Sequence, residues 1–200
     1  MKKIFLIIGI ITFVYSCSVY ETFVNLSRLQ FKLGTVNNFN LNGIDLSNKS
    51  KLNDFNLQDI LNISSMFSSG KFPVSFTLYV DAKNPNDGTG GYKATDATIQ
   101  SFPWRLMIDN KVTVSGNINK PVSVPGTGDV TEIPIVIQFD LAEFFKDEGY
   151  ESLINLALTL GGRNGSTSRL TLYADPVVNT VLGNISYPGE LKIVDKSFTN

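Results

Sequence analysis

The chain has 200 residues, of which 42% are hydrophobic and 18% are charged, so it can fold around a core and is not a disordered tail. Seventeen basic and eighteen acidic residues give a net charge of −1, without the basic excess of a nucleic-acid-binding protein. With no His and a single Cys, the sequence excludes His-based catalysis, intrachain disulfides and cysteine-based zinc or iron–sulfur sites.

The N-terminus has the pattern of a targeting segment. Lys2 and Lys3 precede an apolar run of twelve residues, Ile4–Tyr15. A helix of that length is about 18 Å long, which is too short for the ~30 Å hydrocarbon core of a bilayer. Such a segment is typical of a secretory signal peptide, and we assign residues 1–16 to it.

The only Cys of the chain, Cys17, directly follows this run and the small residue Ser16. This arrangement resembles a bacterial lipoprotein lipobox. The resemblance implies cleavage before Cys17 and acylation of its thiol and new amino group by palmitate-type chains. Residues 17–25 are then expected to form a flexible lipidated tether to the membrane, and the location is the bacterial cell envelope, most simply the outer membrane. The alternative is an ordinary secreted protein with an incidental Cys.

The hydrophobic pattern of the mature chain predicts mainly strands. Short apolar alternations at residues 29–33 and 39–41 predict two strands, and residues 72–82 show the longest alternation of the chain. Between them, residues 56–69 predict a helix with Asn56 as N-cap and Gly70 as its end. Five of its positions, four of them apolar, share one helical face: Leu57, Ile60, Leu61, Ser64 and Phe67.

The second half continues the pattern. Residues 102–108 and 112–118 predict a hairpin with Trp104 in the core, and three further alternations predict strands at residues 133–139, 170–174 and 191–193. Asp140 is expected to cap a helix that ends by Gly149, whereas residues 150–160 fit either a helix or a strand. The whole indicates one domain, residues 26–200, with an immunoglobulin- or fibronectin-III-like antiparallel β-sandwich and short inserted helices.

Few residues suggest chemistry. Asp147, Glu148 and Glu151 form an acidic cluster; paired carboxylates can hydrolyse glycosides, but helix surfaces carry such clusters routinely. The segment 81–88 lacks the ligand spacing of a calcium loop. We therefore expect no cofactor, no metal and no catalytic residue.

Asn84, Pro85 and Asn86 follow the longest predicted strand, and Pro85 ends strand pairing because it has no N–H. The hairpin with Val114-Ser115-Gly116 and then Ile133-Pro134-Ile135 come next. This ordered set resembles the late-embryogenesis-abundant (LEA) type 2 family, also called the water-stress and hypersensitive-response domain. From the residues themselves, the Asn-Pro-Asn turn is expected to be structural.

The resemblance implies a non-enzymatic protein with a binding or stress-protective role at the envelope. The alternative is a structural or accessory subunit of an envelope assembly that pairs with a partner through a strand edge. The sequence does not identify a protein or small-molecule partner.

Overall fold

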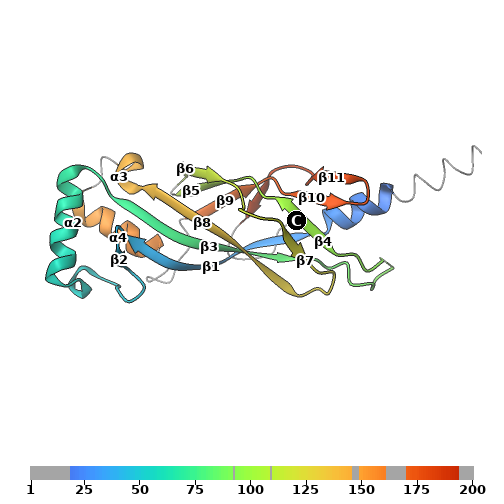
Figure 1. Cartoon of the computed structure of the whole chain (residues 1–200), viewed down its shortest axis with the longest axis horizontal. Helices are drawn as coiled ribbons and strands as arrows, with labels where there is room; N and C mark the ends of the chain where they lie inside the picture. The colour runs from blue at the N-terminus through green and yellow to red at the C-terminus, as the bar shows by residue number, and fades with distance from the viewer. Residues whose placement is uncertain (1–18, 92, 109, 146–148, 161–169, 194–200) are drawn as a thin grey trace, which may run out of the picture.

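Long antiparallel strands run along the longest dimension of the molecule and form one layer of a β-sandwich (Figure 1). The structure, a computed structural model, describes residues 19–91, 93–108, 110–145, 149–160 and 170–193. The long sheet has the order β2-β1-β3-β8, made of β1 (Gln30–Leu41), β2 (Ile44–Asp45), β3 (Pro73–Lys83) and β8 (Val130–Asp140). The predicted alternation of β3 is confirmed, since every second side chain from Val74 to Ala82 is buried.

Two shorter sheets continue one another end to end in the other layer. Their orders are β11-β10-β4-β7 and β12-β9-β5-β6, from β4 (Ala97–Ser101), β5 (Trp104–Ile108), β6 (Lys111–Gly116), β7 (Val122–Val124), β9 (Leu170–Ala174), β10 (Val177–Thr180), β11 (Gly183–Ser186) and β12 (Leu191–Ile193). Pro103 separates β4 from β5 and Pro176 separates β9 from β10, because proline cannot donate to a ladder. The Asp175 N–H donates to the Pro103 carbonyl at 2.9 Å and bridges the two breaks.

The predicted β-sandwich with short helices is therefore confirmed. Aromatic contacts build its core, both between the layers, where Phe31 of β1 lies 5.6 Å from Phe102 between ring centroids, and within the long sheet. Phe76 of β3 stacks on Phe39 at 5.0 Å between ring centroids and meets Phe139 edge-on at 6.3 Å. Trp104 is buried, as predicted. Its ring lies so close to Gly116 that a Cβ there would come within 2.7 Å of it.

Helices gather at one end of the sandwich (Figure 1). They are the 3-10 turn η1 (Leu52–Asp54) and the helices α2 (Leu57–Ser69), α3 (Leu141–Phe144) and α4 (Tyr150–Leu160). The predicted cap of α2 is confirmed, because the Asn56 side chain accepts from the Asp59 N–H at 2.8 Å and the Asp59 carboxylate accepts from the Asn56 N–H at 3.1 Å. Gly70 ends α2 with φ +65°. Residues 150–160, left open by the sequence, are helical.

The apolar face that the sequence marks on α2 faces solvent. Leu57 is 74% exposed, and Ile60, Leu61 and Phe67 are exposed beside it, whereas Ile63 and Met66 are buried. Periodicity finds two apolar stripes on this helix but cannot tell which one packs against the sheets.

Two segments differ from the sequence-based expectation. Residues 30–41 form one strand with register shifts between Leu33 and Val36 and between Asn37 and Asn40, where two strands were expected. Such bulges interrupt the alternation without ending the strand. The second segment, residues 19–27, is a helix; the expected flexible tether, residues 17–25, is therefore wrong for residues 19–25, and residues 17 and 18 lie outside the described residues.

Candidate functional site

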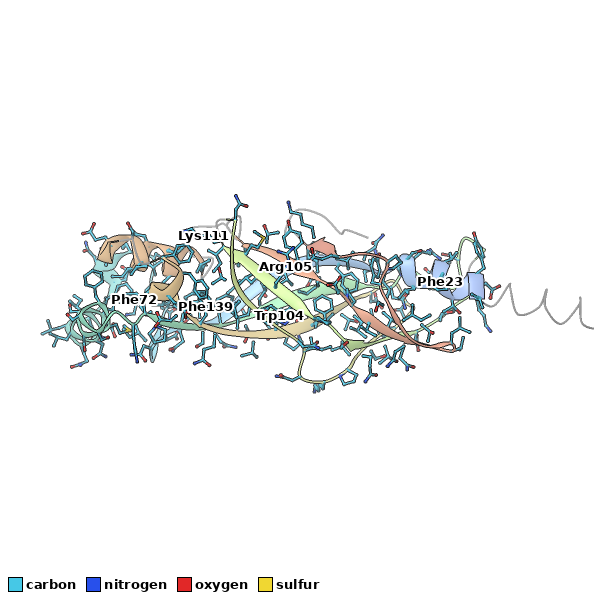
Figure 2. The ribbon with its side chains drawn as sticks, turned by 90° about the horizontal axis from the view of Figure 1, so that it is seen from above. Phe23, Phe72, Trp104, Arg105, Lys111 and Phe139 are labelled. Carbon is cyan, nitrogen blue, oxygen red and sulfur yellow. The ribbon has the colours of Figure 1, made fainter. Side chains whose placement is uncertain are left out.

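The N-terminal helix, residues 19–27, lies at the end of the molecule opposite α2 (Figure 1). Its inner side packs on the sandwich, where Leu26 is only 3% exposed. Its outer side carries Tyr20, which is 71% exposed, and the exposed Phe23. Figure 2 shows Phe23 at this end and Phe72 toward the other.

The Asn-Pro-Asn turn sits beneath this helix and is built around a buried amide. The Asn84 side chain is fully buried, and its Nδ2 donates to the carbonyls of Thr95 and Val124 at 2.8 and 3.0 Å. Its Oδ1 accepts from the Asn86 N–H at 3.2 Å. One side chain thus holds the turn, the following loop and β7 together.

The same turn binds the end of the helix. Asn86 Nδ2 donates to the Asn25 carbonyl at 2.9 Å, one of the last carbonyls of the helix, which have no partner within the helix. Arg28 Nη2 donates to the Pro85 carbonyl at 3.1 Å. The predicted structural residues Asn84, Pro85 and Asn86 are therefore brought together, and they fasten the N-terminal helix to the domain.

Tyr187 holds the helix from the second layer. Its hydroxyl donates toward the carbonyls of Ser27 and Leu29, each at 3.2 Å, and its ring packs edge-on against Phe31 at 6.1 Å. Burial raises the pKa of Tyr187 above its ordinary value of 10.0, which keeps the hydroxyl protonated and able to donate.

A groove separates the helix from β4 and β10. Its volume is about 350 Å³, and its walls combine apolar side chains such as Leu26 and Val178 with polar ones such as Thr98 and Asn179. Asn86 lines it as well, and the Oδ1 atom of that buried side chain has no hydrogen-bond partner among the described residues. The groove is the best-formed place for a small ligand at this end.

Exposed apolar side chains gather beyond the groove. The tip of the β10–β11 hairpin carries Val181, which is 87% exposed, and Leu182, and Val181 shares the groove lining with Thr22 of the helix. We call these residues the apolar end face: Val19, Tyr20, Phe23, Val181 and Leu182. Sequence analysis missed it because β10 and β11 were not predicted. The sequence feature that could have revealed this face is the apolar pair Val181-Leu182 at a turn, directly before Gly183.

The remaining candidate residues do not form a site together. Cys17, Asp147 and Glu148 lie outside the described residues, and Glu151 is exposed. Asp140 is used structurally, since its Oδ1 accepts from the N–H groups of Phe72 and Ala142 at 2.7 and 2.9 Å. Among the described residues, no three His, Cys, Asp or Glu side chains stand close enough to hold a metal ion.

A second cavity, of about 620 Å³, opens at the helical end, lined by Phe67, Phe72, Asp140, Glu143 and Leu153 among others. Its only described carboxylates are Asp140 and Glu143. Because Asp140 is bound to backbone N–H groups, the pair does not form a free acid and base.

Comparisons with known proteins give distant likenesses to solved structures, among them the two that follow. No family model and no curated protein matches the sequence. A crystal structure of a protein from Archaeoglobus fulgidus is 10% identical, with a TM-score of 0.34, over 83% of this chain and 99% of that one. The solution structure of AT1g01470 from Arabidopsis thaliana is 18% identical, with a TM-score of 0.25, over 62% of this chain and 73% of that one. Neither likeness assigns a function.

Among the described residues, every helix is too short or too polar to span a bilayer.

Proposed function

We propose that this is a lipid-anchored protein of the bacterial envelope, held through acyl chains on Cys17, whose LEA type 2-like domain binds or protects rather than catalyses. The observation that carries the proposal is the position of Cys17. It is the only Cys, and it directly follows an apolar run of signal-peptide length.

The start of the described chain supports this reading. Cys17 lies two positions before Val19, and an extended chain advances at most about 3.6 Å per residue. Val19 is the first described residue of a helix that Asn86 and Tyr187 fasten to the domain. Acyl chains on Cys17 therefore place this end of the domain at the membrane, and more than one chain makes the attachment stable.

The binding role is supported by the groove beside the N-terminal helix. It offers an apolar wall with the buried acceptor Asn86 Oδ1 nearby, the mixture found in small-molecule sites.

The anchoring is tested by fractionation of cells that express Cys17→Ala. We expect the variant to leave the membrane fraction, because it has no thiol to acylate. Ser16→Ala is the matched control, since it keeps a small residue before Cys17, and it should stay with the membrane. Cys17→Ala that remains membrane-bound would contradict the proposal.

The non-enzymatic role is tested by a screen of glycoside, ester and peptide substrates with and without divalent metals. We expect no turnover. Turnover that a Glu143→Ala, Glu151→Ala double variant abolishes would make the helical end an active site instead.

One observation favours the alternative role as an assembly subunit. The 11-residue strand β8 pairs along its whole length with β3 and, among the described strands, with no other. Pro134 fits in β8 because its nitrogen lies on the side away from β3, and the exposed Val136 presents its N–H on that same side.

Val136→Pro should keep the fold and release a strand-paired partner from the co-purified native protein. An unchanged set of co-purified proteins would exclude pairing at this edge.

A further inference from the structure

We propose that the apolar end face docks into the surface of the bilayer that holds the acyl chains of Cys17, so that the domain stands on the membrane in one orientation. This inference rests on the proposed lipid anchor, and it adds a second, protein-made contact with the same membrane.

The hairpin tip is the first observation. Tight turns between strands carry Gly, Asn, Asp or Ser because these residues suit the backbone and the solvent, yet this turn carries Val181 and Leu182. The Thr180 hydroxyl donates to the Gly183 carbonyl at 2.7 Å and accepts from the Leu182 N–H at 3.1 Å. The tip is therefore held in shape with its two apolar side chains exposed to solvent.

The N-terminal helix supplies the second observation. Phe23 lies three residues after Tyr20 and four after Val19, the spacings that bring side chains to one helical face, and all three are exposed. Aromatic side chains with a polar tip, such as Tyr20, suit the boundary between headgroups and acyl chains. Helix and hairpin lie about 160 residues apart in sequence, so their shared apolar character is not one local run.

The position of the anchor identifies the bilayer as the occupant of this face. Cys17 lies two residues before Val19, so its Cα is within about 7 Å of the Cα of Val19. A lipid on Cys17 brings the membrane to this end and not to α2, which lies at the opposite end (Figure 1).

The acidic charge of the protein predicts which lipid headgroups it prefers. The exposed Glu21 lies on the same helix, and the mature chain from Cys17 loses Lys2 and Lys3, which makes it more acidic than the full sequence. Acidic residues are repelled by anionic headgroups. We therefore expect docking on zwitterionic phospholipid and weaker docking on anionic lipid.

Trp fluorescence on vesicles tests the docking. The native, acylated chain is extracted in detergent and reconstituted into phosphatidylcholine vesicles, as Leu182→Trp and, as the matched control, Leu57→Trp at the opposite end. Trp104 is a shared background in both variants because it is buried. We expect the emission of Leu182→Trp to shift to the blue and to be quenched by brominated phosphatidylcholine. The emission of Leu57→Trp should stay that of an exposed Trp.

Each other outcome overturns the inference. Leu182→Trp that is not quenched shows that this end stays in water, and quenching of Leu57→Trp shows that the molecule lies flat. A blue shift that grows with protein density but is not quenched by brominated lipid assigns the face to a second copy of the chain.

Whether Cys17 is acylated is measured separately, by the intact mass of the extracted protein. Acylated protein with unquenched Leu182→Trp refutes the docking and leaves the proposed function standing. If Cys17 is not acylated, the proposed anchor fails, and its free thiol can be coupled to a maleimide lipid in the same vesicles. The same quenching then decides the docking.

Discussion

The buried side chain of Asn84 links parts of the chain that lie far apart in sequence. Its amide joins the end of β3 to the loop before β4 and to β7 through three hydrogen bonds. A buried amide is stabilising only when its donors and acceptors are all used. In Asn84 both the amide donor and the amide acceptor make hydrogen bonds. The Asn-Pro-Asn turn is therefore held mainly by Asn84 and not by Pro85.

Asn84→Ala should therefore lower the free energy of unfolding by about 2–4 kcal/mol, because the part-buried carbonyl of Thr95 and the buried carbonyl of Val124 lose their donor. Asn119→Ala, at an exposed position, is the control and should cost less than about 0.5 kcal/mol. Urea unfolding of the two variants measures the difference. Equal midpoints would show that the Asn84 amide is not needed for stability.

Phe76 and Thr77 test the two faces of β3. Phe76 is buried between Phe39 and Phe139, and Phe76→Ala should cost about 3–5 kcal/mol through lost burial and a cavity. Thr77 is half-buried on the other face, and Thr77→Ala should cost less than about 1 kcal/mol. Denaturant midpoints compare them. Similar losses would mean that both faces of β3 are buried.

The raised pKa of Tyr187 predicts that the free energy of unfolding depends on pH. Because burial raises its pKa in the folded state, the unfolded chain ionises first as the pH rises. The contribution of Tyr187 to stability is thus complete below about pH 10 and is lost as the pH rises toward the folded-state pKa. Between about pH 8 and about pH 10.5, the free energy of unfolding should fall less in Tyr187→Phe than in the wild type. An equal or larger fall in the variant would contradict the role of the buried hydroxyl.

At the scale of the elements, the sequence predicts those whose hydrophobic pattern is long and regular. The alternation of β3 and β8 and the Asn56 cap of α2 lead directly to the observed elements. These signals are local, so no tertiary contact is needed to interpret them.

The elements that were missed depend on distant contacts. β4 and β10 are short, and each is completed by pairing with the other across about 80 residues. The N-terminal helix depends on Asn86 and Tyr187. The groove and the apolar end face are built from these elements, so the sequence alone could not place them.

The orientation of α2 gives an element-scale prediction. Ile63 is buried and Leu61 is exposed on the same helix. Ile63→Ala should lower the free energy of unfolding by about 2–5 kcal/mol, whereas Leu61→Ala should change it by less than about 0.5 kcal/mol. Thermal or urea unfolding compares them. A larger loss at Leu61 would mean that the apolar face marked by the sequence packs on the sheets after all.

At the scale of the whole molecule, the long sheet separates two different ends (Figure 1). One end holds the N-terminal helix, the groove and the hairpin tip, and the other holds α2, α3 and α4. The proposed lipid on Cys17 would hold the first end at the membrane and leave the helical end, with the exposed Leu57 and Leu61, facing away from it.

The proposed function depends most on the lipid on Cys17, and the intact mass of the native protein extracted from membranes tests for that lipid. We expect the mass of residues 17–200 plus a diacylglycerol group on the Cys17 thiol, with or without an acyl chain on the new amino group. A mass that corresponds to the chain from Met1, or a mature chain whose Cys17 thiol is free, would contradict it.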